Sequence, residues 1–547
     1  MIMCESMSLT GCGKVLAAAL LLVALSAAPA GAEGGTAVAR ALHEVEEAIA
    51  RWDIQRARAA LEEIPPGNAP AVLWYQGQVA FLAGEYADAR DWFDRLPRRT
   101  HGTAKLEHMK VLARDSLDLA LTLVPFESEH FTLYLDSRKD AVLAAAALAA
   151  LEAAREKAGG WIGWRPTEKV RVEIVPDAGS FERVSGLTRD EIERSGAVGI
   201  CKFNKIMILS PRALVQGYRW RDALAHELVH YLLVRLSAGR APVWLQEGTA
   251  RYGDTLWRSE KSLWMGTAEE GLLAGALREE RLIPFAGMSD SLVRLPSMEK
   301  VRLAFAQCAL AVEYLLGEWG TEGLRGLVES LADERSPEGE GAMEDVLGVD
   351  LAAFEKGWRA HLQGRGFREA EGLTTPGFKL HPGGQAEAAE EWDLDRWQPL
   401  EARRHIRLGD MLRSRQRRRG ALKEYRKALD VAPLSPYVLN RMGRVMLEMN
   451  REQDAEEMFV KAVETSPDYP ASYTGLAEVL ALTGRWQASR EALEIYLEIN
   501  PFNPVVWKDL GSVHMELGEK EAALGYWETS LLLNPQDAEL RRVLGRP

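Results

Sequence analysis

The stretch "ALAHELVHYLL", residues 223–233, decides what the central part of this chain becomes. Its apolar residues recur at the spacing of a buried helix. His226 and His230 lie four positions apart, so a helix directs both imidazoles from one face. This spacing allows the two histidines to bind one metal ion, typically zinc. Glu227 is offset around the helix, where its carboxylate can act as a general base on water without binding the metal.

A third ligand follows in "PVWLQEGTARY", residues 242–252. The turn "SAGRAP", residues 237–242, separates this stretch from the histidine helix. A second helix that begins near Val243 and returns antiparallel would direct Glu247 towards the two histidines. Two histidines and one glutamate leave a fourth position open, as catalytic zinc sites do. We therefore predict a Zn²⁺ site with the ligands His226, His230 and Glu247.

Three strand-like stretches precede the histidine helix. They are "HFTLYL" at residues 130–135, "VRVEIV" at 170–175 and "KIMILS" at 205–210. We expect an alanine-rich helix at about 138–158, between the first two strands. After residue 210 the pattern is helical throughout. Strands followed by helices are typical of an α+β domain, which we place at 126–370.

The C-terminal region repeats with a fixed period. Pro433, Pro467, Pro501 and Pro535 are each 34 residues apart, which indicates helix-turn-helix repeats. Small residues before each proline let paired helices approach closely, and large residues fill the gap between neighbouring helices. These positions resemble the tetratricopeptide repeat family, with four repeats and a partial capping helix at 400–547. The concave surface of such a solenoid usually binds protein, so we expect a protein partner or substrate there.

An N-terminal region at 33–125 carries a weaker copy of this template. The matching residues are Gly77, Gly84, Tyr86, Ala89 and Phe93. We therefore expect a small helical region of similar repeats before the α+β domain. Residues 371–399 begin with a stretch rich in Gly, Pro, Ala and Glu and without an apolar period, which predicts a linker.

The histidine and glutamate motifs together resemble the peptidase MA-like domains of the gluzincin clan. Residues 295–316 and 348–362 are similar to later helices of those domains, so the resemblance covers about 126–365. It implies zinc bound by His226, His230 and Glu247, with Glu227 as the catalytic carboxylate. It also implies that "KIMILS" is the sheet-edge strand along which an extended substrate lies. The expected fold is an α+β zincin-like metallopeptidase domain flanked by all-α helical repeats.

One departure from that family concerns the group that would stabilise the oxyanion. Family members often carry tyrosine where this chain has Phe305, and phenylalanine has no hydroxyl to donate. Tyr314 and Tyr252 are the alternatives, although a packing role is favoured for each.

The N-terminus predicts export. Lys14 precedes an apolar run at residues 15–25, and residues 30–32 are the small residues of a cleavage site. Residues 1–32 are therefore expected to be a secretory signal peptide, and translation from Met7 would give a more typical one. No second apolar run is long enough to span a membrane. We expect a periplasmic or secreted protein, in which Cys201 and Cys308 form a disulfide or stay as two buried thiols.

The formal net charge of −13 argues against nucleic acid as a partner. The basic run at residues 413–419 is expected to be the solvated face of a helix. Two functions remain open. The chain is a zinc metallopeptidase that hydrolyses peptide bonds, with repeats that recruit a substrate or partner. Alternatively, it is a periplasmic assembly scaffold in which the repeats carry the function and the zinc domain is vestigial.

Overall fold

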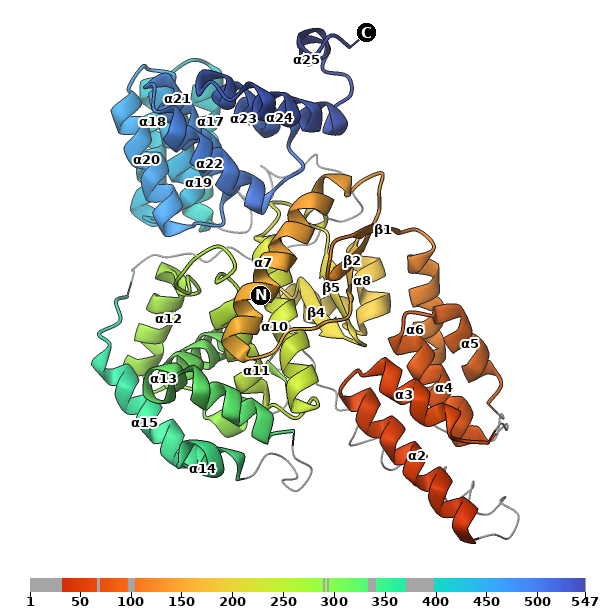
Figure 1. Ribbon diagram of the computed structural model, residues 1–547. Coiled ribbons are helices and arrows are strands. Elements are labelled where there is room, and N and C mark those ends of the chain that lie inside the picture. The colour runs from red at the N-terminus through yellow and green to blue at the C-terminus, as the bar shows by residue number, and fades with distance from the viewer. Residues whose placement is uncertain are drawn as a thin grey trace. The chain divides into compact units, whose positions relative to one another are not determined.

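The computed structural model describes residues 32–65, 69–96, 104–288, 291–292, 295–332, 341–369 and 398–546 (Figure 1). The chain divides into two compact units. The first contains Met1–Leu209, Asp222–Trp264 and Ala276–Gly366. The second contains Ser210–Arg221, Met265–Gly275 and Phe367–Pro547.

The first unit is built on a five-stranded sheet with the strand order β1-β2-β3-β5-β4. Its strands are β1 (Val124–Glu127), β2 (Phe131–Leu135), β3 (Val170–Val175), β4 (Gly199–Lys202) and β5 (Lys205–Leu209). β2, β3 and β5 run parallel, whereas β1 and β4 are antiparallel edge strands. β3 and β5 are almost fully buried, as expected of apolar strands that are covered on both faces.

The strand order corrects one prediction. The outermost strand beside β5 is β4, so the expectation that "KIMILS" forms the sheet edge is wrong. β4 has four residues, "GICK", and a stretch this short shows no clear period in the sequence. Phe203 and Asn204 connect it to β5, and both have a φ of 58°. Positive φ at both central residues is the type I′ geometry, which matches the twist of paired strands.

Helices account for the other elements up to Gly364, and α10 and α12 contain residues of both units. The α-helices are α2 (Ala32–Ala50), α3 (Ile54–Glu62), α4 (Pro70–Leu82), α5 (Tyr86–Asp94), α6 (Ala104–Ala120), α7 (Ala144–Ile162), α8 (Ala178–Ser185), α9 (Arg189–Ser195), α10 (Trp220–Ser237), α11 (Val243–Gly253), α12 (Thr267–Arg278), α13 (Met298–Ser330), α14 (Ala342–Leu347) and α15 (Leu351–Gly364). Short 3₁₀ turns are η2 (Ala141–Leu143), η3 (Pro211–Ala213) and η4 (Phe285–Met288). Within the first unit, α7 packs on β2, and α8 packs on β3 and β5 (Figure 1). This arrangement confirms the predicted α+β class.

The N-terminal helices pair as the repeat template predicts. α2 packs on α3, and α4 packs on α5. Gly77 of α4 lies against the ring of Phe93 on α5, where a Cβ would be 2.4 Å from a ring carbon. Only glycine allows this approach of helix to ring. The N-terminal repeat helices nevertheless belong to the same compact unit as the sheet.

A buried charged cluster joins α5 to the sheet. Lys205 Nζ donates to the hydroxyl of Tyr86 at 2.9 Å and to Glu173 Oε2 at 2.8 Å. The three side chains are almost fully buried. Burial alone would lower the pKa of Lys205, but Glu173 and Tyr86 raise it above its ordinary value. Burial would raise the pKa of Glu173, and Lys205 with Arg171 lowers it below its ordinary value. The cluster is therefore charged and mutually stabilised.

In the second unit, four helix pairs follow one another, with a short helix at the end. They are α17 (Leu400–Ser414), α18 (Arg418–Val431), α19 (Pro436–Leu447), α20 (Glu452–Thr465), α21 (Pro470–Leu482), α22 (Trp486–Ile499), α23 (Pro504–Glu516), α24 (Lys520–Leu533) and α25 (Ala538–Val543). Two apolar cores fill the spaces between them. Gly443 of α19 lies against Phe459 of α20, and a Cβ there would be 2.7 Å from a ring carbon. The predicted repeats and the partial capping helix are thus present as helices.

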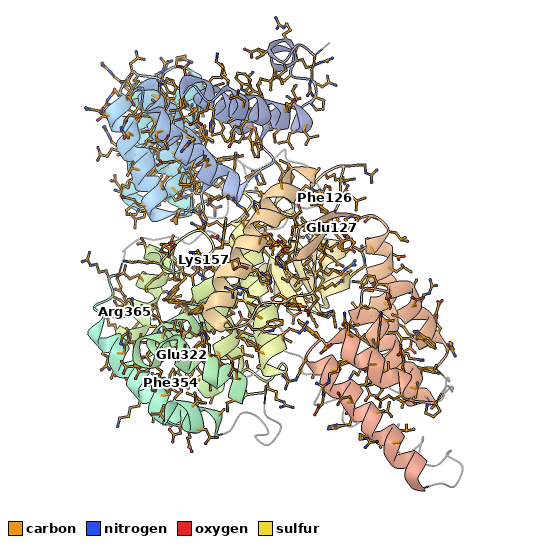
Figure 2. All side chains as sticks on the ribbon, viewed as in Figure 1. Phe126, Glu127, Lys157, Glu322, Phe354 and Arg365 are labelled. Carbon is orange, nitrogen blue, oxygen red and sulfur yellow. The ribbon has the colours of Figure 1, made fainter. Side chains whose placement is uncertain are left out.

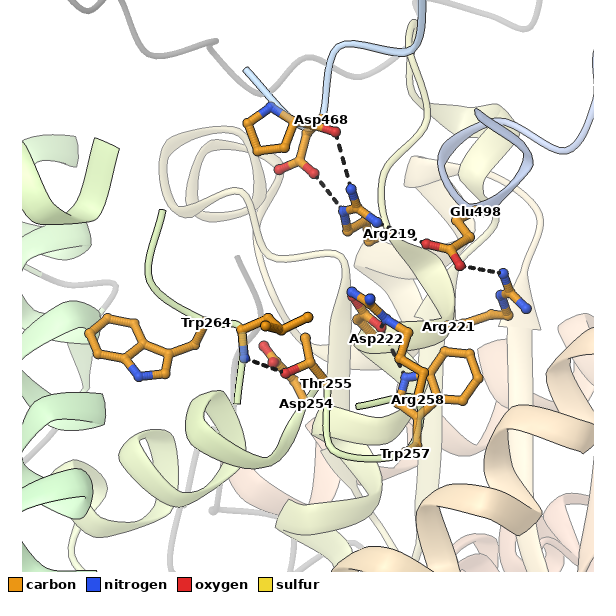
Figure 3. Close-up of polar contacts among 12 residues, drawn as sticks. Arg219, Arg221, Asp222, Asp254, Thr255, Trp257, Arg258, Trp264, Asp468 and Glu498 are labelled. Atoms are coloured by element: carbon orange, nitrogen blue, oxygen red, sulfur yellow. Dashed lines mark hydrogen bonds and ion pairs between the residues drawn. The ribbon is translucent and has the colours of Figure 1, made fainter. Parts of the chain in front are cut away.

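The segment Ser210–Arg221 also belongs to the second unit. Arg219 attaches it to the repeats: Nε donates to Asp468 Oδ1 at 2.9 Å, and Nη1 donates to Glu498 Oε2 at 2.8 Å (Figure 3). The amide of Tyr218 donates to the Ile499 carbonyl at 3.0 Å. These bonds fix the segment to the loop before α21 and to the last turn of α22.

Several predictions concern parts of the chain outside this description. The predicted signal peptide, apart from Ala32, and residues 370–397 of the linker region lie outside the described residues. The domain boundaries at 125 and 370 stay predictions. Among the described residues, none of the helices has the length and apolar character needed to cross a membrane.

Candidate metal centre

α10 carries the sequence "HELVH", and Asp222 anchors its first turn. A carboxylate in the first turn interacts favourably with the helix dipole. Asp222 accepts hydrogen bonds from Trp257 Nε1 at 2.9 Å and from Arg258 Nε at 2.8 Å and Nη2 at 2.7 Å (Figure 3). Trp257 and Arg258 follow α11 in the chain. These bonds therefore tie the helix with the two histidines to the segment after the helix with Glu247.

α10 and α11 bring the three predicted ligands together. The Nε2 atoms of His226 and His230 are 3.1 Å apart. Glu247 Oε2 lies 3.7 Å from His226 Nε2 and 3.5 Å from His230 Nε2. Ligand atoms about 2.0–2.1 Å from one tetrahedral zinc ion are about 3.3 Å apart. The three side chains are at most 2% exposed, so the donor atoms form a compact, buried cluster that fits a single metal ion.

Gly248, the residue after Glu247, lets α11 approach α13. A Cβ on Gly248 would lie 2.2 Å from the backbone carbonyl oxygen of Cys308 and 2.7 Å from Cγ2 of Val312. The carbonyl belongs to the helix backbone and cannot move aside as the end of a side chain can. A larger residue at Gly248 would therefore push α11 outward and displace the carboxylate of Glu247.

The protonation states of the cluster suit metal binding. Burial lowers the pKa of His226 to about 3, although Glu247 raises it. Burial alone would raise the pKa of Glu247, but the two imidazoles beside it lower the pKa by a larger amount, to about 2. At neutral pH the imidazole of His226 is thus neutral and the carboxylate of Glu247 is ionised. These are the forms that bind metal without first losing a proton.

Glu227 lies on α10 against the edge strand β4. A Cβ on Gly199 of β4 would be 2.6 Å from Glu227 Oε1, so the strand backbone covers the carboxylate directly. Among the described residues, neither carboxylate oxygen has a hydrogen bond of good geometry. Burial raises the pKa of Glu227 well above its ordinary value, and Glu247 adds to this. The nearby amide of Cys201 lowers it again without forming a well-aligned bond.

The other predicted residues have packing contacts. The ring of Tyr314 lies 5.4 Å from Phe354 (labelled in Figure 2) and 5.3 Å from His361. Tyr252 lies 5.6 Å from Trp161. These contacts agree with the favoured packing role of both tyrosines. Phe305 is buried in α13.

The two cysteines outside the predicted signal peptide do not pair. Cys201 lies on β4 and Cys308 on α13, and both are buried thiols outside any disulfide. Of the two alternatives, the structure therefore has the thiols and not the disulfide.

Sequence reasoning missed Gly199 and Gly248, which set the positions of Glu227 and Glu247. Their effect depends on close approaches between segments far apart in the chain, which periodicity does not reveal. The available hint was an isolated glycine inside a regular element, which often marks a close backbone contact.

Comparison with known families agrees with this geometry. Residues 170–364 match the model of the Peptidase MA superfamily. Residues 38–102 and 440–504 match the tetratricopeptide repeat model. The chain therefore combines a Peptidase MA superfamily domain with tetratricopeptide repeats on both sides of it. The superfamily match begins at β3, later than the expected start near residue 126. The repeats are of a type that mediates protein–protein interaction.

Solved structures with similarity to this chain include repeat proteins. A crystal structure of MamA is 23% identical, with a TM-score of 0.24, and the alignment covers 25% of this chain and 81% of that one. MamA from Desulfovibrio magneticus RS-1 is 17% identical, with a TM-score of 0.26 and coverage of 27% and 84%. The first repeat domain of Spaghetti bound to an HSP90 peptide is 18% identical, with a TM-score of 0.21 and coverage of 22% and 94%. No curated protein matched the sequence.

Proposed function

We propose that the Peptidase MA domain is an active zinc metallopeptidase that hydrolyses peptide bonds in peptides or proteins. The observation that carries this proposal is the convergence of His226, His230 and Glu247 beside the buried carboxylate of Glu227. A metal that only stabilised the fold would need ligands but no such neighbour. Burying a carboxylate without good hydrogen bonds costs free energy. A strongly perturbed acidic group next to a metal-binding cluster is typical of a catalytic site.

Each residue has a distinct role in this proposal. His226, His230 and Glu247 would hold the zinc ion. When bound, the ion would supply Lewis-acid polarisation of the substrate carbonyl, a lower pKa of water and a preference for the ionised form of nearby carboxylates. Glu227 accepts a proton from the attacking water and passes it to the departing amine. Asp222 holds the start of α10 and Gly248 holds α11 close to α13, so both keep the ligands in register.

The edge strand supports a path for the substrate. β4 has β5 on one side, and its Gly199 lies against Glu227. An extended peptide that adds to the outer edge of β4 would run past this carboxylate. Recognition by strand addition uses main-chain hydrogen bonds, which suits a peptide or protein substrate. The path follows β4 and not the "KIMILS" strand, because β5 lies inside the sheet.

Metal analysis together with a peptide-library digest tests the proposal. Protein purified without chelators should contain about one zinc per chain. Glu227→Gln should retain zinc and lose turnover by about two to four powers of ten. Glu521→Gln, which changes an exposed glutamate of α24, is the matched control and should behave as wild type. Metal-free wild type, or full turnover by Glu227→Gln, would contradict the proposal.

The scaffold alternative has one observation in its favour. The C-terminal repeats have two apolar cores of their own and belong to a separate compact unit, as a partner-binding module would. We propose that these repeats bind a protein partner or substrate in either case. Complementation of a deletion strain separates the two functions. Full rescue by Glu227→Gln, with no rescue by a chain lacking residues 398–547, would favour the scaffold over the peptidase.

We also propose that the chain is exported, to the periplasm or the medium. The support is the N-terminal sequence, with its basic residue, apolar run and small-residue cleavage site. Cell fractionation and N-terminal sequencing test this. The exported protein should begin near Glu33, and an uncleaved protein in the cytoplasm would refute the localisation.

A further inference from the structure

Asn204, in the turn between β4 and β5, bridges two helices that are far apart in the sequence. Its Nδ2 donates to the carbonyl of Leu82, the last residue of α4, at 3.1 Å. Its Oδ1 accepts from the hydroxyl of Tyr231 on α10 at 3.2 Å. The Leu82 carbonyl is one of the last four of its helix, which have no partner inside the helix. Tyr231 directly follows His230, so one side chain links a repeat helix, the edge hairpin and the metal-binding helix.

The neighbouring turn residue is held by the same repeat. Phe203 has a positive φ of 58°, a conformation that costs a residue with a side chain about 1–2 kcal/mol. The residue is 6% exposed, and its ring meets the ring of Phe81 on α4 edge to face, with centroids 5.2 Å apart. Aromatic burial of this kind offsets the backbone cost. The turn geometry therefore depends on the N-terminal repeat.

The hairpin passes this constraint on to Glu227. Lys205, the first residue of β5, is fixed by its bonds to Tyr86 and Glu173. β4 pairs with β5 along its whole length, from Lys202 opposite Lys205 to Gly199 opposite Ile208. A strand of four residues has little freedom to move at one end only. A displacement of the turn thus shifts Gly199, and with it the surface against which Glu227 rests.

We propose that Asn204 is a positioning residue for peptide hydrolysis. Through Asn204, the N-terminal repeat contributes to the geometry of the catalytic site. The two hydrogen bonds of Asn204 hold the hairpin so that β4 keeps Glu227 and the substrate edge in register. The inference rests on the proposed peptidase function. It differs from the expected use of such repeats, because this repeat acts on the edge strand of its own chain.

Amide hydrogen exchange of the full chain without metal tests whether Asn204 holds the hairpin in place. Asn204→Gly removes both hydrogen bonds and suits the positive φ of the turn. Loss of two hydrogen bonds should speed exchange of residues 199–204 by about 10-fold. Asn450→Gly is the matched control, because Asn450 is an exposed residue with a φ of 54° in the second unit. Exchange at the wild-type rate in Asn204→Gly would overturn the inference.

Turnover of the zinc-loaded chain tests the positioning part. For Asn204→Gly, kcat per bound zinc should fall by about 10-fold or more, since small misplacements of catalytic groups have effects of this size. The loss should fall on kcat more than on KM, with zinc content and melting temperature close to wild type. Tyr231→Phe removes one of the two bonds and should give a smaller loss. A purely structural role would instead lower the melting temperature and zinc content, and an unchanged kcat would overturn the positioning role.

The two tests fail in different ways. If wild type binds zinc but cleaves nothing, the proposed function falls, and the exchange measurement still decides whether Asn204 holds the hairpin. If wild type cleaves in a Glu227-dependent way and Asn204→Gly cleaves equally well, only the further inference falls.

Discussion

The N-terminal and C-terminal repeats share a template but occupy different settings. Gly77 against Phe93 in the first region and Gly443 against Phe459 in the second are the same contact between a small residue and an aromatic ring. The C-terminal pairs enclose their own apolar cores. The N-terminal repeat instead shares a compact unit with the sheet. The repeat template thus specifies how two helices pair, whereas the residues on their outer faces decide what the pair packs against.

Charged contacts show the difference most clearly. Tyr86 on α5 and Lys205 and Glu173 on the sheet form a buried cluster, in which the ion pair is 2% exposed on each side. In the second unit, Arg485 pairs with Glu456, and these side chains are 45% and 26% exposed. A buried pair is costly to break, because the remaining charge stays out of water, whereas an exposed pair contributes little. Four predictions test this comparison, the first with the largest expected effect.

Glu173→Gln should destabilise the first unit by about 3–5 kcal/mol, because it leaves the buried charge of Lys205 without its carboxylate. Calorimetry of the full chain is the measurement. We expect the transition of the first unit to move to lower temperature and that of the repeats to stay in place. If both transitions moved together, the N-terminal and C-terminal regions would unfold as one cooperative unit.

One buried acid of the first unit, Asp254, should make the stability of that unit depend on pH. Burial raises the pKa of Asp254 from 3.8 to about 7. The folded chain therefore keeps a proton that the unfolded chain loses, and this contribution to stability is lost as the pH rises towards 7. Asp254→Asn mimics the neutral form. Relative to wild type, it should gain about 3 kcal/mol between pH 5 and pH 8.

Urea unfolding of both proteins at the two pH values checks this prediction. Taking the difference between variant and wild type at each pH removes the contributions of other groups that titrate in both chains. A constant difference would mean that Asp254 is already ionised in the folded state at pH 5.

Gly77→Ala and Gly443→Ala test whether the shared contact has a shared energy. Each new methyl group meets an aromatic ring, and overpacking of this kind costs about 1–3 kcal/mol. The two costs should be similar, but their consequences should differ. Gly77→Ala should reduce zinc occupancy at limiting metal, because its repeat packs on the Peptidase MA domain, whereas Gly443→Ala should leave occupancy unchanged. Equal occupancy in both variants would count against the link between the N-terminal repeat and the metal site.

The smallest effect should come from Glu456→Gln. An exposed ion pair contributes about 0–1 kcal/mol, so the repeat transition should barely move in calorimetry. A large shift would show that surface charges support the C-terminal solenoid more than their exposure suggests.

The sequence predicted the candidate site better than its surroundings. His226 and His230 were identified because a helix converts a spacing along the chain into a common face, and Glu247 because a second helix was expected to return antiparallel to the first. The α+β class and the helix that starts at Val243 followed from the same local reasoning. The edge strand was assigned to β5 on the family resemblance, and the four residues of β4 carry too little pattern to have corrected this assignment. Asn204, Gly199 and Gly248 had no local pattern either, because each acts through a contact with a distant segment.

What the sequence determined by itself was the part that depends on periodicity. The positions of the histidines, the 34-residue repeat and the apolar strands are all readable because helices and strands turn a fixed spacing into a surface. The tertiary structure alone decided which strand lies at the edge, which backbone covers Glu227 and which repeat shares a core with the sheet. These features arise from close packing between segments that are distant in the chain. Packing depends on the shapes of both partners, and a single stretch of sequence contains only one of them.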